Sequence, residues 1–372
     1  MNILIVPDSF KGTLTAQQVC DIIGQAFADT LKNTNIIKLP AADGGEGLCA
    51  CLYKIVGGEM IKTWVSGVFG AQMEAEYLLL PDKTAVVEMA ACAGLPLAGD
   101  ARNPEKATTY GVGELVSDAV SKGAERILLG LGGSATNDCG TGMAAALGWK
   151  FTDKSGNEFI PTGETLCDIF AITRPEKQIG IPVVAACDVE NPLYGTDGAA
   201  YVFAPQKGAD EAMVKRLDCG LRHVANVIFD ACGEDVSQIK GVGAAGGMGA
   251  GAVAFLGAEL KKGIDILLDT ADFDSKAEDS DLIITGEGRL DSQSVNGKVI
   301  SGVAARAAKH SKKTIAICGS KGDGAEEIMK LGVEQLYFSC ETEKTFEEIL
   351  ATCENDLYNI AVKAAKEISG VI

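Results

Sequence analysis

The chain opens with Asn2-Ile3-Leu4-Ile5-Val6-Pro7-Asp8-Ser9-Phe10-Lys11-Gly12-Thr13, in which an apolar run passes directly into a polar loop. An unbroken run of branched apolar residues is typical of a strand buried on both faces of a parallel sheet. Thr15 and Gln18 have the spacing of a capping box, which predicts that a helix begins after the loop. This order of strand, loop and helix predicts an α/β fold.

Three more apolar stretches end in loops that mix glycine with acids, amides or hydroxyls. These loops are Asp43-Gly44-Gly45-Glu46-Gly47, Gly132-Gly133-Ser134-Ala135-Thr136-Asn137-Asp138 and Gly286-Glu287-Gly288-Arg289-Leu290-Asp291. Glycine lets backbone N–H groups approach an anion closely. Carboxylates cannot hold that anion themselves, but they can hold Mg²⁺. The combination of glycine and acids therefore indicates a site for a metal-bound phosphate.

The C-terminal part of the chain repeats the alternation of strand and helix. The expected elements are strands at 282–285 and 314–318, a helix at 299–309, and a long helix after the capping box of Thr345 and Glu348. Because this pattern matches the N-terminal one, we expect both chain ends to share one doubly wound parallel sheet.

The middle of the chain has a different character. Residues 60–65, 74–80 and 84–88 are expected to form consecutive strands without helices between them, which indicates a mixed or antiparallel sheet. At 372 residues the chain is also too long for one ordinary core. We therefore expect two α/β domains, one formed by residues 1–55 plus 275–372, and an inserted one with a mixed sheet formed by residues 56–274.

One glycine-rich stretch has a second interpretation. Gly241-Val242-Gly243-Ala244-Ala245-Gly246 matches the GxGxxG spelling of dinucleotide-binding loops, but the residues before it do not resemble a strand. The alternative that we favour is a close-packed glycine loop that caps a helix at residues 250–260.

The composition excludes several classes of partner. The chain has 33 Lys and Arg against 51 Asp and Glu, a net charge of −18, so nucleic acids and anionic membranes are not expected as partners. No basic segment precedes the first apolar run, so we expect no signal peptide. No uncharged apolar run reaches the roughly 18 residues of a membrane span. The 12 cysteines include no CxxC pair, which favours reduced thiols in the cytoplasm.

Several common catalytic devices are disfavoured by the sequence. His223 and His310 are the two histidines and are expected in a helix and a basic turn, which argues against zinc and imidazole chemistry. Gly297-Lys298 is not part of a Walker A motif, because Ser292 replaces the first glycine and Val299 follows the lysine. No GxSxG motif supports covalent hydrolysis.

All four acid-and-glycine loops are expected at the carboxyl ends of strands, where open parallel sheets bind ligands. Lys11 and Arg289 are the cations of these loops and suit carboxylate or phosphate oxygens. Asp188 directly follows an apolar strand, where desolvation would help it to accept a proton. The candidate carboxylates, each of which has helix capping as its alternative role, are Asp8, Asp43, Glu46, Asp138, Asp188, Glu287 and Asp291.

Six segments carry a resemblance to a known family. They are Pro7-Asp8-Ser9-Phe10-Lys11-Gly12, Pro40-Ala41-Ala42-Asp43-Gly44-Gly45-Glu46-Gly47, Gly130-Leu131-Gly132-Gly133-Ser134-Ala135-Thr136-Asn137-Asp138, Cys187-Asp188-Val189-Glu190-Asn191-Pro192-Leu193, Ala204-Pro205-Gln206-Lys207-Gly208-Ala209 and Gly286-Glu287-Gly288-Arg289-Leu290-Asp291. In content and order they resemble the class I glycerate kinases. Each segment alone is a weak signal, but the set is specific.

The resemblance implies ATP-dependent phosphorylation of D-glycerate, with the 2-hydroxyl favoured over the 3-hydroxyl. It implies two α/β domains, one of them flavodoxin-like and built from both chain ends. The expected small molecules are ATP, Mg²⁺ and D-glycerate. The oligomeric state stays open, with a homodimer as one alternative.

We assign candidate roles from the chemistry of the side chains. The catalytic candidates are Lys11, Arg289, Asp188 as proton acceptor and Asp291 as its alternative. The substrate-binding candidates are Ser9, Lys11, Asn137 and Arg289. The candidates for contacts with ATP are Gly132, Gly133, Ser134, Gly286 and Gly288, and those for the metal are Asp43, Glu46 and Glu287.

Two other functions compete with the kinase. An NAD(P)-dependent oxidoreductase would use residues 241–246, and a non-catalytic protein would bind a small anion without ATP. The second alternative leaves the acids of the four loops unexplained.

Overall fold

Strand β1 (Asn2–Pro7) lies inside a parallel sheet, as its unbroken apolar run predicts. The computed structural model describes residues 1–41, 47–295, 298–340 and 345–370. In β1, the side chains of Ile3 to Val6 are completely buried. The strand pairs in parallel with β2 (Asn35–Lys38) on one side and with β12 (Leu282–Gly286) on the other. The two chain ends therefore share one sheet.

The order of the strands in this sheet is that of a flavodoxin-like domain. From β2 and β1, the sheet continues through β12 and β14 (Thr314–Lys321) to β15 (Val333–Cys340), and all pairs are parallel. Counted along the chain, these strands have the order 2-1-3-4-5. The short strand β13 (Arg289–Leu290) extends the sheet beside the end of β14. The predicted doubly wound parallel sheet is confirmed.

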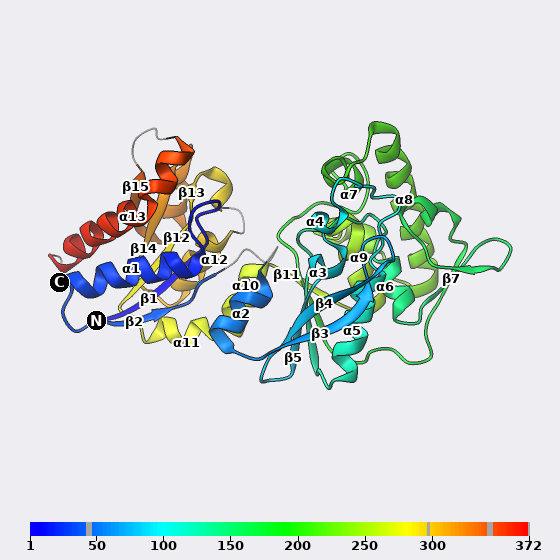
Figure 1. The fold of residues 1–372 in the computed structure, drawn as a ribbon, viewed down its shortest axis with the longest axis horizontal. Coiled ribbons are helices and arrows are strands. Elements are labelled where there is room, and N and C mark those ends of the chain that lie inside the picture. The colour runs from blue at the N-terminus through cyan, green and yellow to red at the C-terminus, as the bar shows by residue number, and fades with distance from the viewer. Residues whose placement is uncertain (42–46, 296–297, 341–344, 371–372) are drawn as a thin grey trace. The chain divides into compact units, whose positions relative to one another are not determined.

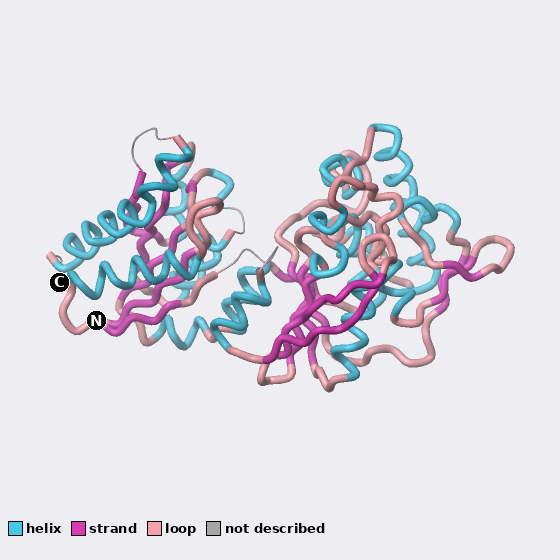
Figure 2. The backbone as a smooth tube through the Cα atoms, viewed as in Figure 1, coloured by secondary structure: helices cyan, strands magenta, loops and turns pink. Residues whose placement is uncertain are grey.

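Helices cover both faces of this sheet (Figures 1 and 2). Alternate residues of β14 point to opposite faces, so Ile315 packs with one cluster of buried side chains and Ala316 with another. On the first face lie α1 (Ala16–Thr30) and α13 (Phe346–Ser369), side by side in Figure 1. On the second face lie α12 (Val299–Lys309) and the 3-10 helix η5 (Ala325–Leu331). The helices α10 (Gly263–Thr270) and α11 (Phe273–Glu278) contact α12.

The two predicted capping boxes begin α1 and α13. Thr15 Oγ1 accepts a hydrogen bond from the Gln18 backbone N–H at 3.2 Å, and Thr345 Oγ1 accepts one from that of Glu348 at 3.3 Å. In each box the side chain at the third helical position accepts in return from the backbone N–H of the threonine. These boxes fix where both helices of the first face begin.

The second sheet is mixed, as predicted. Its order is β11 (Glu259–Lys261), β10 (Val183–Ala186), β6 (Arg126–Gly130), β5 (Thr84–Glu88), β4 (Gln72–Leu79) and β3 (Glu59–Ser66). The pairs from β11 to β5 are parallel, whereas β5, β4 and β3 are antiparallel neighbours. The predicted hairpin and third strand are therefore confirmed.

The other elements around this sheet are mostly short. They are α2 (Leu48–Val56), α3 (Ala90–Ala93), α4 (Leu95–Ala98), α5 (Tyr110–Ser121), α6 (Thr141–Ala146), α7 (Ala199–Phe203), α8 (Glu211–Cys232), α9 (Ala244–Leu256), the 3-10 helices η1 (Gly163–Asp168), η2 (Pro205–Lys207) and η3 (Val236–Gln238), and a small sheet of β7 (Lys150–Thr152), β8 (Glu158–Phe159) and β9 (Ala171–Thr173). The 3-10 helix η4 (Ser292–Val295) lies in the part of the chain that forms the first sheet. In the described part of the chain, no helix is both long enough and apolar enough to cross a membrane.

The predicted helix at residues 250–260 is wrong at its C-terminal end. Helix α9 (Ala244–Leu256) contains left-handed residues at Ala245, Gly246 and Gly247, so its regular part begins only after them, and it ends where Gly257 adopts a left-handed φ of 64°. Leu260 is not helical, because it pairs with Ala185 in the second sheet.

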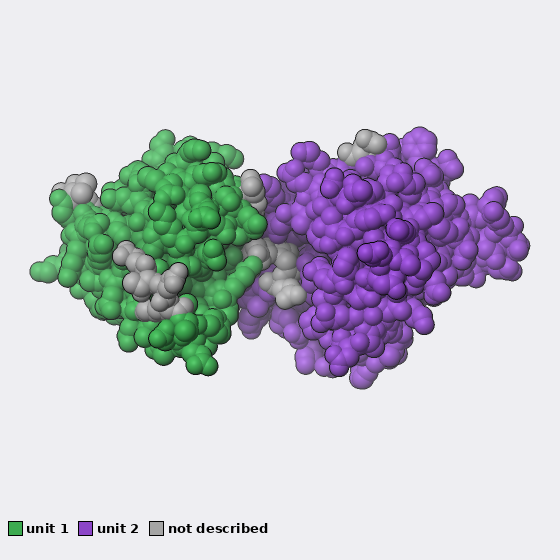
Figure 3. Space-filling view, turned by 90° about the horizontal axis from the view of Figure 1, so that it is seen from above, with its two compact units in different colours: residues 1–43, 264–372 green, residues 44–263 purple. Residues whose placement is uncertain are grey.

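The chain divides into two compact units, coloured separately in Figure 3. The terminal unit consists of residues 1–43 and 264–372, and the inserted unit of residues 44–263. The predicted domain boundaries, at residues 56 and 274, stay a prediction. In the structure α2 belongs to the inserted unit because Glu88 accepts hydrogen bonds from the backbone N–H groups that begin it, from Gly47 at 2.7 Å and Leu48 at 3.2 Å. Helix α11 belongs to the terminal unit, where Asp274 pairs with His310, the residue directly after α12.

The stretch Gly241–Gly246 is a close-packed glycine segment, as we favoured. It follows η3 rather than a strand. Gly246 has a φ of 69°, and a Cβ atom there would lie 2.1 Å from the Thr136 carbonyl oxygen. Its own carbonyl accepts the Cys139 backbone N–H at 3.1 Å. The space that a dinucleotide pyrophosphate would need is filled by the chain itself, so the geometry does not support the oxidoreductase alternative.

We predict that Gly246→Ala destabilises the protein by about 1–3 kcal/mol more than Gly257→Ala, measured by urea unfolding. Both glycines have a left-handed φ, which costs alanine roughly 1–2 kcal/mol. Only Gly246 lacks space, because a Cβ at Gly257 meets nothing within 4 Å. Equal losses in the two variants would contradict the close packing.

Candidate functional site

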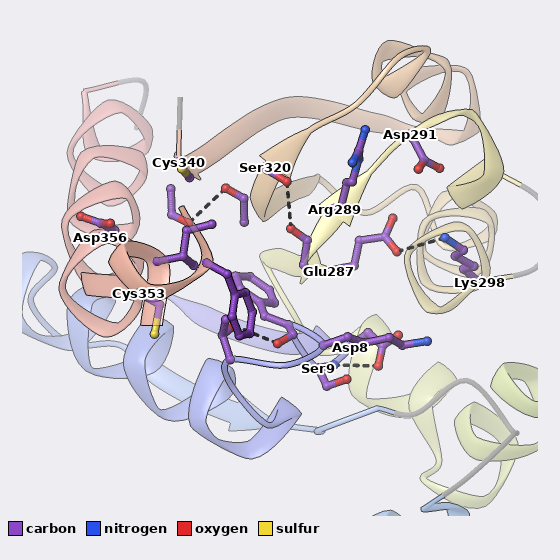
Figure 4. Close-up of a pocket in the computed structure, with 18 residues that line it drawn as sticks. Asp8, Ser9, Glu287, Arg289, Asp291, Lys298, Ser320, Cys340, Cys353 and Asp356 are labelled. Atoms are coloured by element: carbon purple, nitrogen blue, oxygen red, sulfur yellow. Dashed lines mark hydrogen bonds and ion pairs between the residues drawn. The ribbon is translucent and has the colours of Figure 1, made fainter. Parts of the chain in front are cut away.

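A pocket of about 340 Å³ lies at the carboxyl ends of β1, β12, β14 and β15 in the terminal unit (Figure 4). The chain leaves β1 toward β2 on one side and returns to β12 on the other, so the order of strands reverses between β1 and β12. Open α/β sheets bind ligands beyond the carboxyl ends of the strands at such a reversal. The sheet therefore places the pocket where its topology predicts a ligand.

Close backbone contacts fix the loops that form the pocket. The Asp8 backbone N–H donates to the Gly286 carbonyl at 2.8 Å, which joins the loops after β1 and β12. A Cβ atom at Gly286 would lie 1.9 Å from the Ile317 carbonyl oxygen, and one at Gly319 would lie 2.3 Å from that of Gly288. Packing therefore accounts for Gly286, which we had assigned to ATP, whereas Gly288 also lines the pocket. Contact of either glycine with ATP stays a prediction.

Four carboxylates line the pocket, and three of them, Asp8, Glu287 and Asp291, belong to the loops after β1 and β12 (Figure 4). Asp8 and Glu287 are each only 5% exposed. Burial raises the pKa of Glu287, and the charges of Asp8 and Asp291 raise it further, while Ser294 and Lys298 act in the opposite direction. In the described part of the chain, Glu287 Oε1 is buried without a hydrogen-bond partner. The site thus holds a carboxylate oxygen that lacks a donor or a cation.

Three cations belong to the same pocket. Lys11 and Arg289, both predicted, are exposed there, and Lys298 lies with its Nζ 4.0 Å from Glu287 Oε2. The guanidinium group binds carboxylate and phosphate oxygens with two parallel hydrogen bonds, whereas lysine acts as a point charge. The predicted Ser9 also lines this pocket. An anion can therefore bind here in spite of the negative charge of the chain.

The residues of this pocket fit Mg²⁺ when a phosphate completes its ligands. No group of three or more His, Cys, Asp or Glu side chains within the described ranges is arranged to hold a metal ion. Mg²⁺ usually binds proteins through one or two carboxylates and takes its other ligands from phosphates and water. The unpartnered Oε1 of Glu287 suits such a site, with Asp8 or Asp291 as the second carboxylate. The predicted metal ligands Asp43 and Glu46 lie outside the described residues.

The other predicted residues follow two neighbouring strands of the inserted unit. The loop of residues 132–138 follows β6, Asp188 follows β10, and these strands pair in parallel. Asp188 is exposed, and its Oδ1 accepts the Gly263 backbone N–H at 2.9 Å. The expected desolvation of Asp188 is therefore wrong, because the residue lies beyond the buried end of the strand. Its role as proton acceptor stays a prediction.

A buried lysine that we did not predict lies beneath this loop. Lys207 is 2% exposed, and its Nζ donates to Ser134 Oγ at 2.8 Å and to the Thr136 carbonyl at 2.7 Å. Burial lowers the pKa of Lys207 to about 7, against the opposing effect of the Asp138 charge. Burial raises the pKa of Asp138, which accepts two hydrogen bonds from Thr109 at 2.8 Å. The loop thus rests on a buried network of charged and polar groups.

Asn137, a predicted substrate ligand, is completely buried in this loop. Within the described ranges, both polar atoms of its side-chain amide lack a hydrogen-bond partner, as does Thr136 Oγ1. Gly132 and Gly133 are half-buried, and the Ser134 hydroxyl is held by Lys207. Contacts of these residues with ATP phosphates stay predictions.

The structure thus gathers the predicted residues into one group in each unit. The group in the terminal unit is Ser9, Lys11, Glu287, Gly288, Arg289 and Asp291. The group in the inserted unit is Gly132, Gly133, Ser134, Asn137 and Asp188. Two charged residues were missed as site residues, Lys298 and Lys207, and Asp8 was named as a candidate carboxylate without a specific role. The position of Asp8 directly after a buried strand indicates a place in the site. By contrast, no hydrophobic periodicity in the sequence around Lys207 indicates that this lysine is buried.

We predict that Glu287→Gln raises the midpoint of thermal unfolding at pH 7–8 in the absence of divalent cations. A carboxyl group whose pKa is raised in the folded state contributes stability below its ordinary value of 4.5 and loses it as the pH rises through the folded-state pKa. Each pKa unit corresponds to about 1.4 kcal/mol. The gain should vanish near pH 4. Glu347→Gln, at an exposed position of α13, is the control, and a destabilised Glu287→Gln at pH 7 would contradict this account.

Lys207→Met tests the buried ammonium group. Because the folded-state pKa of Lys207 is lowered from 10.5 to about 7, wild-type stability should rise with pH between these values. The free energy of unfolding of Lys207→Met, relative to wild type, should therefore fall between pH 6 and pH 9. Urea unfolding at several pH values measures this difference, and a difference independent of pH would show that Lys207 is not desolvated in solution.

Known proteins resemble this chain over almost its whole length. The chain is 42% identical to a glycerate kinase of Bacillus cereus, over 96% of this chain and 95% of that protein, and 43% identical to the glycerate 2-kinase of Escherichia coli K12, over 91% and 90%. It also matches the crystal structure of a Salmonella typhimurium LT2 protein assigned as glycerate kinase 2, with a TM-score of 0.86 and 38% identity, over 100% of this chain and 98% of that one. The model of the glycerate kinase family matches residues 3–369, and the chain belongs to this family.

Proposed function

We propose that the protein transfers the γ-phosphoryl group of ATP to D-glycerate. The observation that carries this proposal is the pocket where the strand order reverses, in which three carboxylates lie beside three cations in a chain of the glycerate kinase family. Phosphoryl transfer needs positioning, a metal ion and donors around the phosphates more than covalent chemistry. The pocket offers cations that can contact anions and carboxylates that can bind a metal ion.

The cations bind and orient the two anions. Arg289 binds the carboxylate of glycerate with two hydrogen bonds from its planar guanidinium group, and Lys11 binds a phosphate oxygen. Both side chains are exposed at the pocket, so they are accessible to ligands from solvent. Lys298, next to Glu287, is a third cation for the transferred phosphoryl group. Without such cations, the net charge of −18 would repel both substrates.

Glu287 holds Mg²⁺, with Asp43 and Glu46 as the other predicted ligands. When bound, the ion neutralises charge on the phosphate oxygens. Glu287 suits this role because its carboxylate is buried, faces two further acids and has one oxygen without a hydrogen-bond partner among the described residues. A cation at this place removes the cost of burying that charge.

A carboxylate accepts the proton of the attacking hydroxyl group. Asp188 is our first candidate and Asp291 the alternative. Asp291 lines the pocket, but its Oδ1 already accepts the Gln293 backbone N–H at 2.9 Å. Asp188 is exposed, so it is accessible to a substrate. The transition state of phosphoryl transfer is loose, so this proton transfer contributes less than the positioning of the anions.

We propose that the 2-hydroxyl is phosphorylated, which gives 2-phospho-D-glycerate and ADP. The Escherichia coli relative, at 43% identity, is named a glycerate 2-kinase. We also infer that the protein acts in the cytoplasm, because several of its 12 cysteines, such as Cys92 and Cys318, are thiols buried in the core, as is usual in a reducing compartment.

One coupled assay tests the proposed activity against its alternatives. The purified protein is incubated with ATP, Mg²⁺ and D-glycerate, and ADP release is measured. We expect ADP release that requires all three components. NAD(P)H binding without ATP turnover would indicate an oxidoreductase. Glycerate binding that is independent of ATP and Mg²⁺, without turnover, would indicate an anion-binding protein.

We predict that Arg289→Ala lowers kcat/KM for glycerate by about 10²–10³-fold, because a charge-assisted bidentate contact is lost. Arg289→Lys keeps the positive charge but not the two parallel hydrogen bonds of the guanidinium group, so it should recover only part of the lost kcat/KM. Arg126→Ala, at an exposed position where β6 begins, is the matched control. Wild-type kinetics in Arg289→Ala would remove this residue from the site.

A further inference from the structure

One half of the pocket in the terminal unit has a composition that glycerate does not explain. Beside the charged residues already described, the lining includes Phe346, Ile349 and Cys353, all on α13, and Phe10 from the loop after β1. Figure 4 shows the labelled residues of the two ends on different elements, with Arg289 and Lys298 far from Cys353 on α13. A three-carbon acid is small and polar throughout, so it fills only part of a pocket of about 340 Å³. The apolar half therefore needs another occupant.

Phe346 is the residue that defines this apolar half. It is the first residue of α13, directly after the capping box of Thr345, so the position of its backbone is fixed. Its side chain is nevertheless 57% exposed. One edge of the ring lies against the backbone of the loop after β1, because a Cβ atom at Gly12 would be 3.3 Å from the Phe346 ring. An exposed aromatic ring at the wall of a pocket offers a flat face to a ligand.

We infer that the apolar half of this pocket binds the nucleobase of the nucleoside triphosphate, with its phosphates directed toward Asp8, Lys11 and Glu287. The inference rests on the proposed function, which requires a nucleotide. A nucleotide has an aromatic ring at one end and several negative charges at the other, and the pocket has the complementary division. Bases stack on aromatic side chains through their π-faces, which is worth roughly 1–3 kcal/mol per base.

Polar groups between the two ends suit the sugar and the edge of the base. The hydroxyls of Ser320 and Ser339 line the pocket and point their hydrogens toward the carbonyls of Gly288 and Gly319, at 3.5 and 3.3 Å, so oxygen lone pairs stay available as acceptors. Asp356 is the carboxylate of the apolar end, where it accepts the Thr352 hydroxyl at 2.7 Å. It can also accept an exocyclic amino group of a base.

The test measures the binding of ADP, adenosine and tripolyphosphate to the full chain by calorimetry, with Mg²⁺ and without glycerate. Phe346→Ala should weaken ADP and adenosine binding roughly 5- to 100-fold, because base stacking is lost. Tripolyphosphate, which has no base, should keep its affinity. Phe346→Trp should restore ADP binding. Leu350→Ala is the matched control, since Leu350 is exposed on the next turn of α13 but does not line the pocket.

Kinetics separate this inference from the proposed function. In Phe346→Ala, the KM for ATP should rise while the KM for glycerate stays unchanged. Unchanged ADP affinity in Phe346→Ala, or an equal loss for ADP and tripolyphosphate, would overturn the nucleobase site. If wild type binds ADP and Phe346→Ala weakens it, but D-glycerate is never phosphorylated, then the proposed substrate is wrong and the nucleobase site stands.

Discussion

The pocket depends on the close approach of the backbone at the carboxyl ends of β1, β12 and β14. Gly286 at the end of β12 lies against the Ile317 carbonyl of β14, and Gly319 of β14 lies against the Gly288 carbonyl, at separations that leave no space for a side chain. The hydrogen bond from the Asp8 N–H to the Gly286 carbonyl joins the loop after β1 to β12. These contacts hold the backbone on which Glu287 and Asp8 are buried. The glycines of the family segments therefore position the acids, whether or not they also contact a phosphate.

Each unit buries a charged group near loops that carry candidate residues. In the terminal unit, Glu287 is buried near two acids, which raises its pKa and makes a bound cation favourable. In the inserted unit, Lys207 is buried beneath the loop of residues 132–138, and burial lowers its pKa to about 7. A buried charge is costly unless it is paired. The stability lost to such groups is common at functional sites, where geometry and charge serve ligand binding rather than folding.

Much of the fold could be predicted from local patterns. The apolar runs of β1 and β12 and the capping boxes at Thr15 and Thr345 indicate elements by themselves, and together they placed both chain ends in one sheet. The small sheet of β7, β8 and β9 escaped prediction because its strands have only two or three residues each. The helix prediction is wrong at Leu260 because pairing with β10, which is distant in the sequence, decides the conformation of this residue.

The candidate site was predictable to a smaller extent. Its residue types follow from chemistry, but burial follows from tertiary contacts: Lys207 is held by Ser134, 73 positions away in the sequence.

The central claim is that this pocket serves transfer of a phosphoryl group from ATP to D-glycerate. The most direct measurement is ³¹P NMR of the protein with ATP, Mg²⁺ and D-glycerate. The account predicts that the γ-phosphate signal of ATP is replaced by a phosphomonoester signal split into a doublet by the single proton on carbon 2. Release of inorganic phosphate alone, or ATP that stays intact, would contradict it.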